Sequence, residues 1–526
     1  AFGTFVEGNT RECSLNMVMD CSVVGVCSIV SGCASFLWHP FLDGVSAFGT
    51  FVMLALTAHW TLFALRCRRA RLSGGCVPQQ PSALPDKLPS LSVITPIKGV
   101  HVESMDNWRS VVETEYDGDI EFIFVVESDD DPAYAPLKQL QNEALTSCSK
   151  NLKGVKVAVA GMGFHCSQKI HNMLEGVSMV DRESKYVLFL DDDVGLYRTT
   201  FRDLVMEIEA DDKVFVATGF PYDWMPSKDV PFPSYLKLVY RWTSLLLLYK
   251  ERPPVVWGGC MLMRREDLHS NRYGMMEAWR SRGYSDDMIV GSVCVKEGRA
   301  VALPATCIFP HKLGSHDNFG NYWNFSCRQM FVLDTYHNST ERLQNYILLF
   351  VVSGLLPSVT VFSLAINCAR SFAWVCHLAH VVNSCAAPCE LPGSIHLLVA
   401  AWVSYVFVFL AIRETTLQAL GLLNFLLPSR AQIPVVTPCM FRGVAAFIVH
   451  HAILPLAAVF GFLSSKVVWS GVTYTVNKGR ITSVSRMTPE GKILTRPAEE
   501  SLEDAKARHG SRGFLRSGKA SPSNFL

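Results

Sequence analysis

Long apolar stretches constrain this chain most, because a run of about 20 apolar residues spans the hydrocarbon core of a bilayer. Nearly charge-free stretches of this kind cover Val45–Leu65, Tyr346–Ile366, Ile395–Ile412 and Val444–Leu463. Charged residues make up 18% of the chain, against about 25% in soluble domains. The pattern excludes wholesale disorder, disfavours a purely soluble enzyme and favours a membrane protein with a sizeable polar domain. The net charge of +1 gives no basic excess that would favour nucleic acid.

Other apolar segments leave the number of membrane spans open. Met17–Leu37 contains many small residues and one aspartate, so the sequence leaves open whether this segment spans the membrane. Ser371–Cys385 is short: it crosses, lies in the interface or sits in a lumenal loop, whereas Leu417–Leu427 is predicted to be an interfacial helix. If Ser371–Cys385 does not cross, four cysteines could pair in an oxidising lumen; the alternative is reduced cysteines within membrane helices. These are Cys368, Cys376, Cys385 and Cys389.

Basic residues orient the chain. RCRRAR (Arg66–Arg71) follows the first strong apolar stretch directly, so the positive-inside rule places the chain after it in the cytosol. Composition shifts then divide the sequence into segments. We predict N-terminal membrane segments over 1–72, a linker over 73–90, a catalytic domain over 91–336, transmembrane or interfacial helices over 337–466, a strand-like segment over 467–482 and a disordered basic tail over 483–526.

The polar domain is predicted to be α/β. Short apolar runs rich in β-branched residues are typical of buried strands, and mixed polar segments between them indicate helices. Alternating strands and helices favour a mostly parallel sheet. The predicted strands are Leu91–Ile97, Ile120–Val126, Val155–Gly161, Tyr186–Leu190 and Val214–Gly219, and the predicted helices include Pro136–Ser147 and Gln168–Val180.

The strongest chemical signal is YVLFLDDDV (Tyr186–Val194), in which a buried strand ends in three aspartates. In open α/β sheets ligands bind at the carboxyl ends of the strands. Alternation along the chain points Asp191 and Asp193 the same way. Adjacent carboxylates repel each other, so Mg²⁺ or Mn²⁺, completed by diphosphate oxygens, is a natural counter-charge. The alternative is a polar turn at the end of the strand.

A second acidic cluster, VVESDDDPAY (Val125–Tyr134), also follows a predicted strand. It places Glu127 and Asp131 at the same edge of the sheet. By itself the cluster is equally typical of a solvated turn before Pro132. Two acidic strand ends in one domain favour a ligand site.

A third cluster is GYSDDMIVG (Gly283–Gly291), in which Asp286 and Asp287 begin a predicted helix. Carboxylates are favoured there by the helix dipole, so simple capping is the alternative to a general base. SQKIHN (Ser167–Asn172) supplies Lys169, a weak candidate for a diphosphate partner.

Several common signatures are missing from the sequence. It contains no Walker A lysine, no GxSxG and no GxGxxG, which argues against a P-loop kinase, an α/β-hydrolase and a Rossmann dehydrogenase. The histidines show no HExxH-type spacing, so we interpret them as structural or surface residues. They include His165, His171, His311 and His316.

Three acidic motifs in this order, on an α/β domain followed by apolar spans, resemble processive-type family-2 glycosyltransferases. The similarity is closer to ceramide glucosyltransferases, particularly the plant and algal form, and covers roughly residues 91–480. The segments that carry it are TPIKG (95–99), FVVESDDDPAY (124–134), CSQKIHN (166–172), KYVLFLDDDV (185–194), WGGCM (257–261), GYSDDM (283–288), YWNFSCRQMFVLDTY (322–336) and VVWSGVTYTVNKGRI (467–481).

The resemblance implies roles for individual residues. The first acidic motif falls on Asp131, the second on Asp191 with Asp193 as a DxD-like pair, and the third, the catalytic base, on Asp287. A fourth motif, Gln or Arg followed two residues later by Arg-Trp, matches only in part. FSCRQ (Phe325–Gln329) keeps Arg328 but has Gln329 where tryptophan is expected, which leaves the acceptor side less defined.

The resemblance implies a GT-A fold and inverting transfer of glucose from UDP-glucose to the primary hydroxyl of ceramide, at the cytosolic face of Golgi or endoplasmic reticulum membranes. Glu127, Asp131, Lys169 and Asp191 would hold the donor. Other lipid- or polysaccharide-directed glycosyltransferases are the nearest alternative, such as a dolichyl-phosphate glucosyltransferase or a cellulose- or hyaluronan-synthase-like polymerase. A multi-span transporter with a nucleotide-binding domain is the alternative from another class.

Overall fold

A seven-stranded sheet forms the centre of the polar domain in the computed structural model, which describes residues 37–74, 87–146, 151–245, 250–314, 317–336, 339–384, 395–428, 431–487 and 492–498. The strand order is β3-β2-β1-β4-β7-β5-β8, with β7 antiparallel to β4 and β5 and the other pairings parallel. The predicted mostly parallel α/β architecture is therefore confirmed. The strands are β1 (Leu91–Pro96), β2 (Ile120–Val126), β3 (Leu152–Val159), β4 (Tyr186–Leu190), β5 (Val214–Thr218), β7 (Cys260–Arg264) and β8 (Ala300–Ala302).

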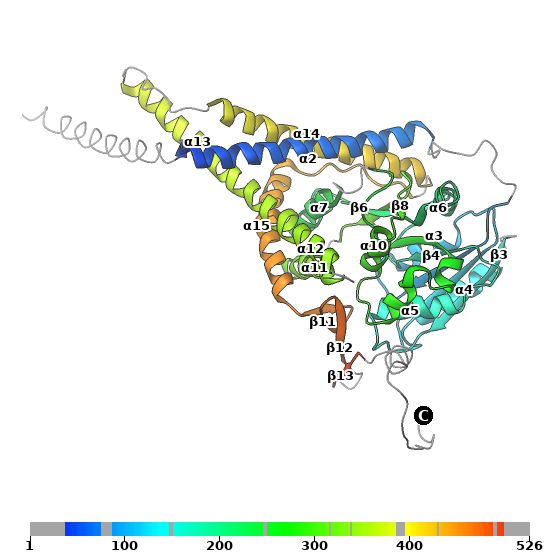
Figure 1. Cartoon of the computed structure of the whole chain (residues 1–526). Helices are drawn as coiled ribbons and strands as arrows, with labels where there is room; N and C mark the ends of the chain where they lie inside the picture. The colour runs from blue at the N-terminus through cyan, green and yellow to red at the C-terminus, as the bar shows by residue number, and fades with distance from the viewer. Residues whose placement is uncertain are drawn as a thin grey trace, which may run out of the picture.

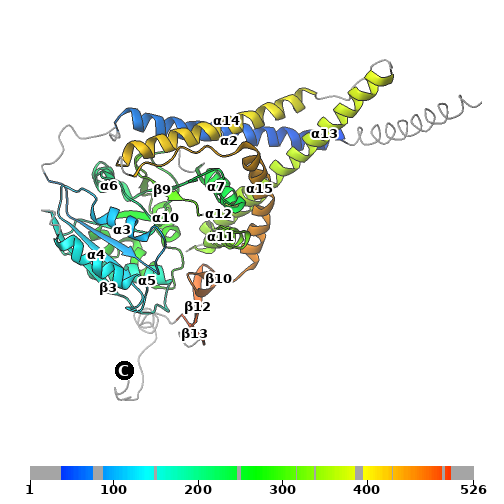
Figure 2. The same ribbon diagram turned by 180° about the vertical axis from the view of Figure 1, so that it is seen from behind.

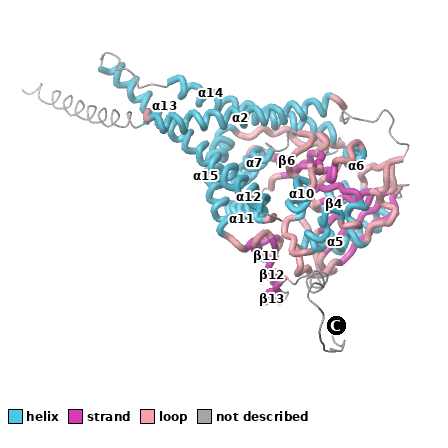
Figure 3. The backbone as a smooth tube through the Cα atoms, viewed as in Figure 1, coloured by secondary structure: helices cyan, strands magenta, loops and turns pink. Residues whose placement is uncertain are grey.

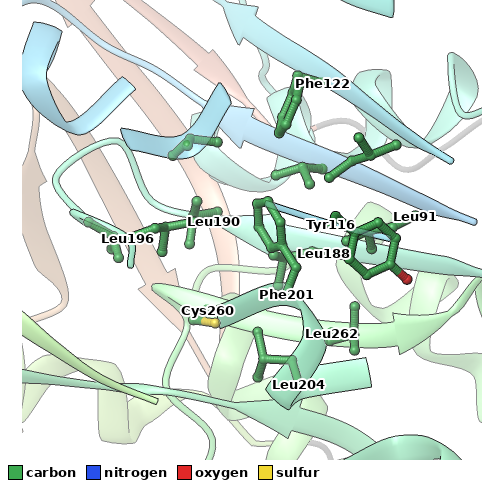
Figure 4. Close-up of a cluster of buried hydrophobic side chains, with 14 of the residues drawn as sticks. Leu91, Tyr116, Phe122, Leu188, Leu190, Leu196, Phe201, Leu204, Cys260 and Leu262 are labelled. Atoms are coloured by element: carbon green, nitrogen blue, oxygen red, sulfur yellow. The ribbon is translucent and has the colours of Figure 1, made fainter. Parts of the chain in front are cut away.

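Helices cover both faces of this sheet (Figure 3). Side chains alternate along each strand, so Leu188 and Leu190 of β4 pack on one face while Val187 and Phe189 pack on the other. Figure 4 shows the first of these clusters, in which Phe201 lies against the sheet. The helices of the polar domain are α3 (Ser104–Val112), α4 (Tyr134–Thr146), α5 (Gln168–Ser178), α6 (Thr200–Glu209), α7 (Phe232–Ser244), α8 (Arg265–His269), α9 (Met275–Arg280), α10 (Asp286–Lys296), α11 (Phe319–Phe331) and the short η2 (Arg272–Gly274) and η3 (Val332–Asp334).

A two-stranded parallel sheet stands beside the main sheet. It pairs β6 (Phe220–Trp224) with β9 (Ile308–Lys312) and places Asp223 directly opposite His311. Since β6 follows β5 after a single glycine, this small sheet lies at the carboxyl edge of the main sheet.

Four helical segments in the described residues are long and apolar enough to cross a membrane: Pro40–Leu72, Ser339–Cys376, Ile395–Leu426 and Met440–Leu463. In Figures 1 and 2, α2 and α14 run side by side along one side of the polar domain, and α15 runs down another side. These helices are α2 (Pro40–Leu72), α12 (Ser339–Ile347), the π-helical η4 (Leu348–Leu355), α13 (Leu356–Ser384), α14 (Ile395–Leu426) and α15 (Met440–Leu463).

Two short apolar segments belong to longer helices. Ser371–Cys385 is no separate segment, because α13 runs unbroken through Ser384, and Cys368 and Cys376 on it are free thiols. Leu417–Leu427 is no separate interfacial helix, because α14 continues to Leu426. The last turns of α14 bury Leu422 and Leu423, since α2 lies beside them. Met17–Leu37 falls almost entirely outside the described residues, as do Cys385 and Cys389.

The C-terminal half of α2 is hydrogen-bonded to the polar domain. Trp60 donates its indole N–H to the carbonyl of Trp242 in α7, at 2.8 Å. Arg66 donates to the carbonyl of Lys250 at 2.9 Å and to that of Leu303. Because the acceptors are backbone carbonyls, these hydrogen bonds join α2 to the backbone of the polar domain.

A four-stranded antiparallel sheet follows α15, in the order β10-β11-β12-β13. The disordered tail expected from residue 483 is therefore wrong for its first part, since two strands extend beyond that point. Composition suggested disorder, but Val484 and Arg486 are buried by pairing with β11 and by contact with the polar domain. The rest of the tail lies outside the described residues. The strands are β10 (Lys466–Trp469), β11 (Val472–Asn477), β12 (Arg480–Met487) and β13 (Ile493–Pro497).

Candidate active site

A cavity of about 510 Å³ opens at the carboxyl edge of the main sheet. Strands β1, β2 and β4 are parallel, so the segments that follow them meet at this edge. The antiparallel β7 begins here, and its preceding Gly259 accepts a hydrogen bond from the backbone N–H of Asp191 at 3.0 Å. The predicted site residues that line the cavity are Lys169, Asp191, Asp193, Asp286, Asp287, Arg328 and Gln329.

Lys169 connects the second and third acidic motifs. It lies on α5, which begins where the Ser167 hydroxyl accepts the Ile170 N–H. The side chain is 13% exposed, and its Nζ lies 2.8 Å from Oδ1 of Asp191 and 3.0 Å from Oδ2 of Asp286. These carboxylates raise the pKa of Lys169 although burial opposes the charged amine. Lys169 therefore places its ammonium between two acidic segments.

The neighbouring aspartates of the third motif have different surroundings. Asp286 is buried and faces Lys169, and burial raises its pKa despite that partner. Asp287 is half-buried and also lines the cavity. Its Oδ1 accepts from the Ser285 hydroxyl at 2.5 Å, and its Oδ2 accepts from the backbone N–H of Gly258 at 3.2 Å. These donors hold the Asp287 carboxylate in one orientation, as a positioned base requires.

The three aspartates after β4 carry more negative charge than their neighbours compensate. Burial raises the pKa of Asp191 to about 7; Lys169 opposes that shift, and repulsion from Asp193 adds to it. Burial also raises the pKa of Asp192 to about 8, with Asp193 and Asp191 adding repulsion. Crowded carboxylates of this kind fit a bound cation.

Asp193 faces a histidine. His311 Nε2 lies 4.0 Å from Oδ2 of Asp193, while its Nδ1 lies 2.9 Å from Oδ1 of Asp223. Burial would lower the pKa of His311, but the Asp223 carboxylate outweighs it and raises the pKa. A second cavity, of about 1090 Å³, shares Asp193 and His311 with the first. The interpretation of His311 as a structural or surface residue missed this position in the site.

The described residues contain no group of three or more His, Cys, Asp or Glu side chains arranged to hold a metal ion. Two or three protein oxygens still suit Mg²⁺ when substrate phosphates complete the shell. Asp191 and Asp193 are hard oxygen ligands, and both line the cavity. The residues present therefore fit a divalent cation that binds together with a diphosphate.

Glu127 and Asp131 stand outside this cavity. Glu127 forms ion pairs with Lys98 and Arg486, each at 2.8 Å. Asp131 Oδ1 accepts from the backbone N–H groups of Gly99 and Ala133, each at 2.9 Å. Asp131 thus ties the loop after β1 to the loop after β2, at the same edge of the sheet.

Sequence reasoning missed several residues that the structure brings to the site. Asp223 and His311 each lie near the end of a short strand, so strand-end position was a usable signal for both. Trp469 also lines the cavity, but it comes from the sheet that follows the membrane helices. Nothing in its sequence surroundings pointed to the pocket.

Two comparisons with known proteins gave matches. The model of glycosyl transferase family 21 matches residues 49–377, which is more than half of the chain. Among solved structures, the chain is similar to a mannosyltransferase from Pyrobaculum calidifontis in complex with GDP-mannose and Mn²⁺. The identity is 16%, the alignment covers 68% of this chain and 99% of that one, and the TM-score is 0.36.

Proposed function

The chain belongs to glycosyl transferase family 21, and from that premise we propose that it transfers glucose from UDP-glucose to the primary hydroxyl of ceramide, with inversion. The observation that carries the proposal is a single cavity holding both a strand-end acid pair, Asp191 and Asp193, and a separately held carboxylate, Asp287. Inverting transfer needs both parts: one that holds the departing nucleotide and one that takes a proton from the acceptor.

The donor side is proposed to lie along the carboxyl ends of β1, β2 and β4. Glu127 and Asp131 would border the uridine and ribose. Lys169 and Asp191 would hold the diphosphate end, where the ammonium of Lys169 also keeps two carboxylates from repelling each other. Gly258 and Gly259 carry no side chains, which leaves room for Asp286 beside Gly258 and for the Trp257 ring beside Gly259.

Mg²⁺ or Mn²⁺ would be held by Asp191 and Asp193, with His311 in reach, and would neutralise charge on the UDP leaving group. Asp223 would orient the imidazole of His311 through the 2.9 Å contact to Nδ1. Carboxylates that hold a ligating histidine in this way fix its orientation and tautomer.

Asp287 is proposed to accept the proton of the acceptor hydroxyl as that oxygen attacks the anomeric carbon from the face opposite UDP. Ser285 and Gly258 hold the carboxylate at the cavity wall. General-base assistance typically contributes about 10²–10⁴-fold to the rate.

The membrane helices support a lipid acceptor. Removing an alkyl chain from a bilayer costs about 0.8 kcal/mol per CH₂ group, so a catalyst for ceramide gains from working at the bilayer surface. Four segments long and apolar enough to span flank the catalytic domain in the described chain. We propose that the domain faces the cytosol from Golgi or endoplasmic reticulum membranes.

The test is transfer by the purified full-length chain in liposomes, using UDP-[³H]glucose, short-chain ceramide and Mn²⁺ or Mg²⁺. Wild type should form labelled glucosylceramide, and Asp287→Asn should reduce the rate by about 10²–10⁴-fold. Asp117→Asn is the matched control, because Asp117 is exposed, lies in the loop that precedes β2 and lines neither cavity. Labelled product without ceramide, or an unaffected Asp287→Asn, would overturn the proposal and favour another lipid or a growing glycan as acceptor. Flux of label without turnover would favour a transporter.

A further inference from the structure

One wall of the cavity includes a residue from outside the catalytic domain. Trp469, at the end of β10, lines the cavity together with Arg328, Gln329 and Val332. The other three belong to α11 and η3, the helices that lead towards the membrane segments. The wall therefore combines the last polar helices before the spans with the first strand after them.

Trp469 is held rigidly. It pairs with Val472 across a two-residue hairpin turn formed by Ser470 and Gly471. Their φ angles are +48° and +76°, and positive φ at both central residues is typical of the tight type I′ turn. On its other side Trp469 packs edge-on to Tyr284, with ring centroids 6.1 Å apart. A fixed turn and a buried aromatic neighbour leave the indole little freedom to move.

Arg328 lies over this indole, with its guanidinium carbon 5.7 Å from the ring centroid. Both side chains are half-buried, so each keeps surface for the cavity. The guanidinium offers hydrogen-bond donors and the indole offers an apolar face. This pair suits a ligand that carries hydroxyl or amide oxygens beside C–H groups.

The wall adjoins the proposed base. Tyr284, against which Trp469 packs, is separated from Asp287 by two residues, and Ser285 between them donates to the Asp287 carboxylate. A ligand resting on the wall would thus present its hydroxyl beside Asp287. The nucleotide-binding carboxylates after β4 belong to a different element of the cavity lining.

We propose that Trp469 forms the acceptor-binding wall of the site. Its indole, which comes from the post-membrane sheet, would supply the aromatic surface that is missing at position 329, where this chain has Gln329 and the family motif has tryptophan. This inference rests on the proposed function. Its ligand is the polar headgroup of the lipid acceptor, whose hydroxyls and amide would face Arg328 while its C–H surface packs on the indole.

The test measures KM separately for short-chain ceramide and for UDP-glucose in the full-length protein, for wild type, Trp469→Leu and Trp469→Phe. Leucine keeps apolar bulk and loses the ring, so the ceramide KM should rise about tenfold, which corresponds to about 1.4 kcal/mol. The KM for UDP-glucose should stay within about twofold of the wild-type value. Phenylalanine keeps a ring and should recover most of the ceramide affinity.

Val468→Ala is the matched control, because Val468 precedes Trp469, points the other way along the strand and is 65% exposed. It should leave both KM values unchanged. A ceramide KM unaltered by Trp469→Leu, a rise confined to the UDP-glucose KM, or failure of Trp469→Phe to recover affinity would overturn the inference while the proposed function stands. Absence of glucosylceramide from wild type would overturn both.

Discussion

The ion pair between Arg486 and Glu127 allows a quantitative test of how the post-membrane sheet serves the catalytic domain. Arg486 lies on β12 and its side chain is 6% exposed, and that of Glu127 is 11% exposed. Besides Glu127 at 2.8 Å, the guanidinium donates to the carbonyl of Gly163 at 3.0 Å and to the side chain of Gln168. Arg486→Met removes all of these contacts while keeping much of the apolar volume.

Breaking a buried ion pair by deleting one partner costs about 3–5 kcal/mol. The lower end applies here, because Glu127 keeps Lys98 at 2.8 Å. A loss of about 3 kcal/mol makes local opening about 150-fold more frequent. Amide hydrogen exchange of β11 and β12, measured by mass spectrometry on the full-length protein, should accelerate by that order, whereas β4 should exchange as in wild type.

A double-mutant cycle isolates the pair. If Arg486 and Glu127 act through each other, the combined variant Glu127→Gln/Arg486→Met should lose much less stability than the sum of the losses in the two single variants. Val484 buries its side chain in the apolar cluster of the same sheet, so Val484→Ala serves as a packing control whose effect should add to that of Glu127→Gln. Full additivity of the charge variants, or unchanged exchange in Arg486→Met, would refute the reasoning.

Three further outcomes are expected. Gly258→Ala places a Cβ 2.8 Å from Oδ2 of Asp286 and should slow transfer at least about tenfold, since small misplacements at a site are costly. Gly291→Ala is the control, because its Cβ has its nearest neighbour at 4.0 Å, and it should not slow transfer. Equal rates for the two variants would contradict the packing argument. Lys169→Met leaves two carboxylates without their shared ammonium and should abolish transfer and lower the thermal midpoint in detergent; an unchanged midpoint would show that the ammonium is not needed there. Burial raises the pKa of Glu127, but Lys98 and Arg486 outweigh it and leave that pKa below its ordinary value. The protection of β12 is therefore complete above about pH 4.3, the usual glutamate value, and is lost as the pH falls below it; loss at a higher pH, or the same profile in Glu127→Gln, would contradict this.

Much of the fold follows from local pattern. Strands β1 to β5 were predictable, because a strand buried on both faces is a continuous apolar run, as in Tyr186–Leu190. The short parallel strand β8 was not predicted. The acids after β4 were predictable as site residues, because parallel strands present their carboxyl ends at one edge. That Asp286 and Asp287 belong with them was implied by the family resemblance alone. β7 was not predicted, since the residues after the Gly pair of WGGCM pair antiparallel with strands distant in sequence.

The rest of the site depends on contacts between distant segments. His311 has no ligand spacing in the sequence, and only the pairing of β6 with β9 places it beside Asp223 and Asp193. Arg486 looked like one of many basic residues in a polar tail. Its burial arises from a partner 359 positions away, a separation at which composition and periodicity carry no information.

The position of the post-membrane sheet also bears on when during synthesis the protein can become active. A nascent chain that ends before residue 466 already carries every acidic residue of the cavity, yet it lacks both Trp469 and Arg486. Those two residues become available only after α15, the last apolar helix described, has left the ribosome. The cavity wall that contains Trp469 can therefore form only after all four candidate spans of the described chain have been synthesised, and a chain interrupted among them lacks that wall.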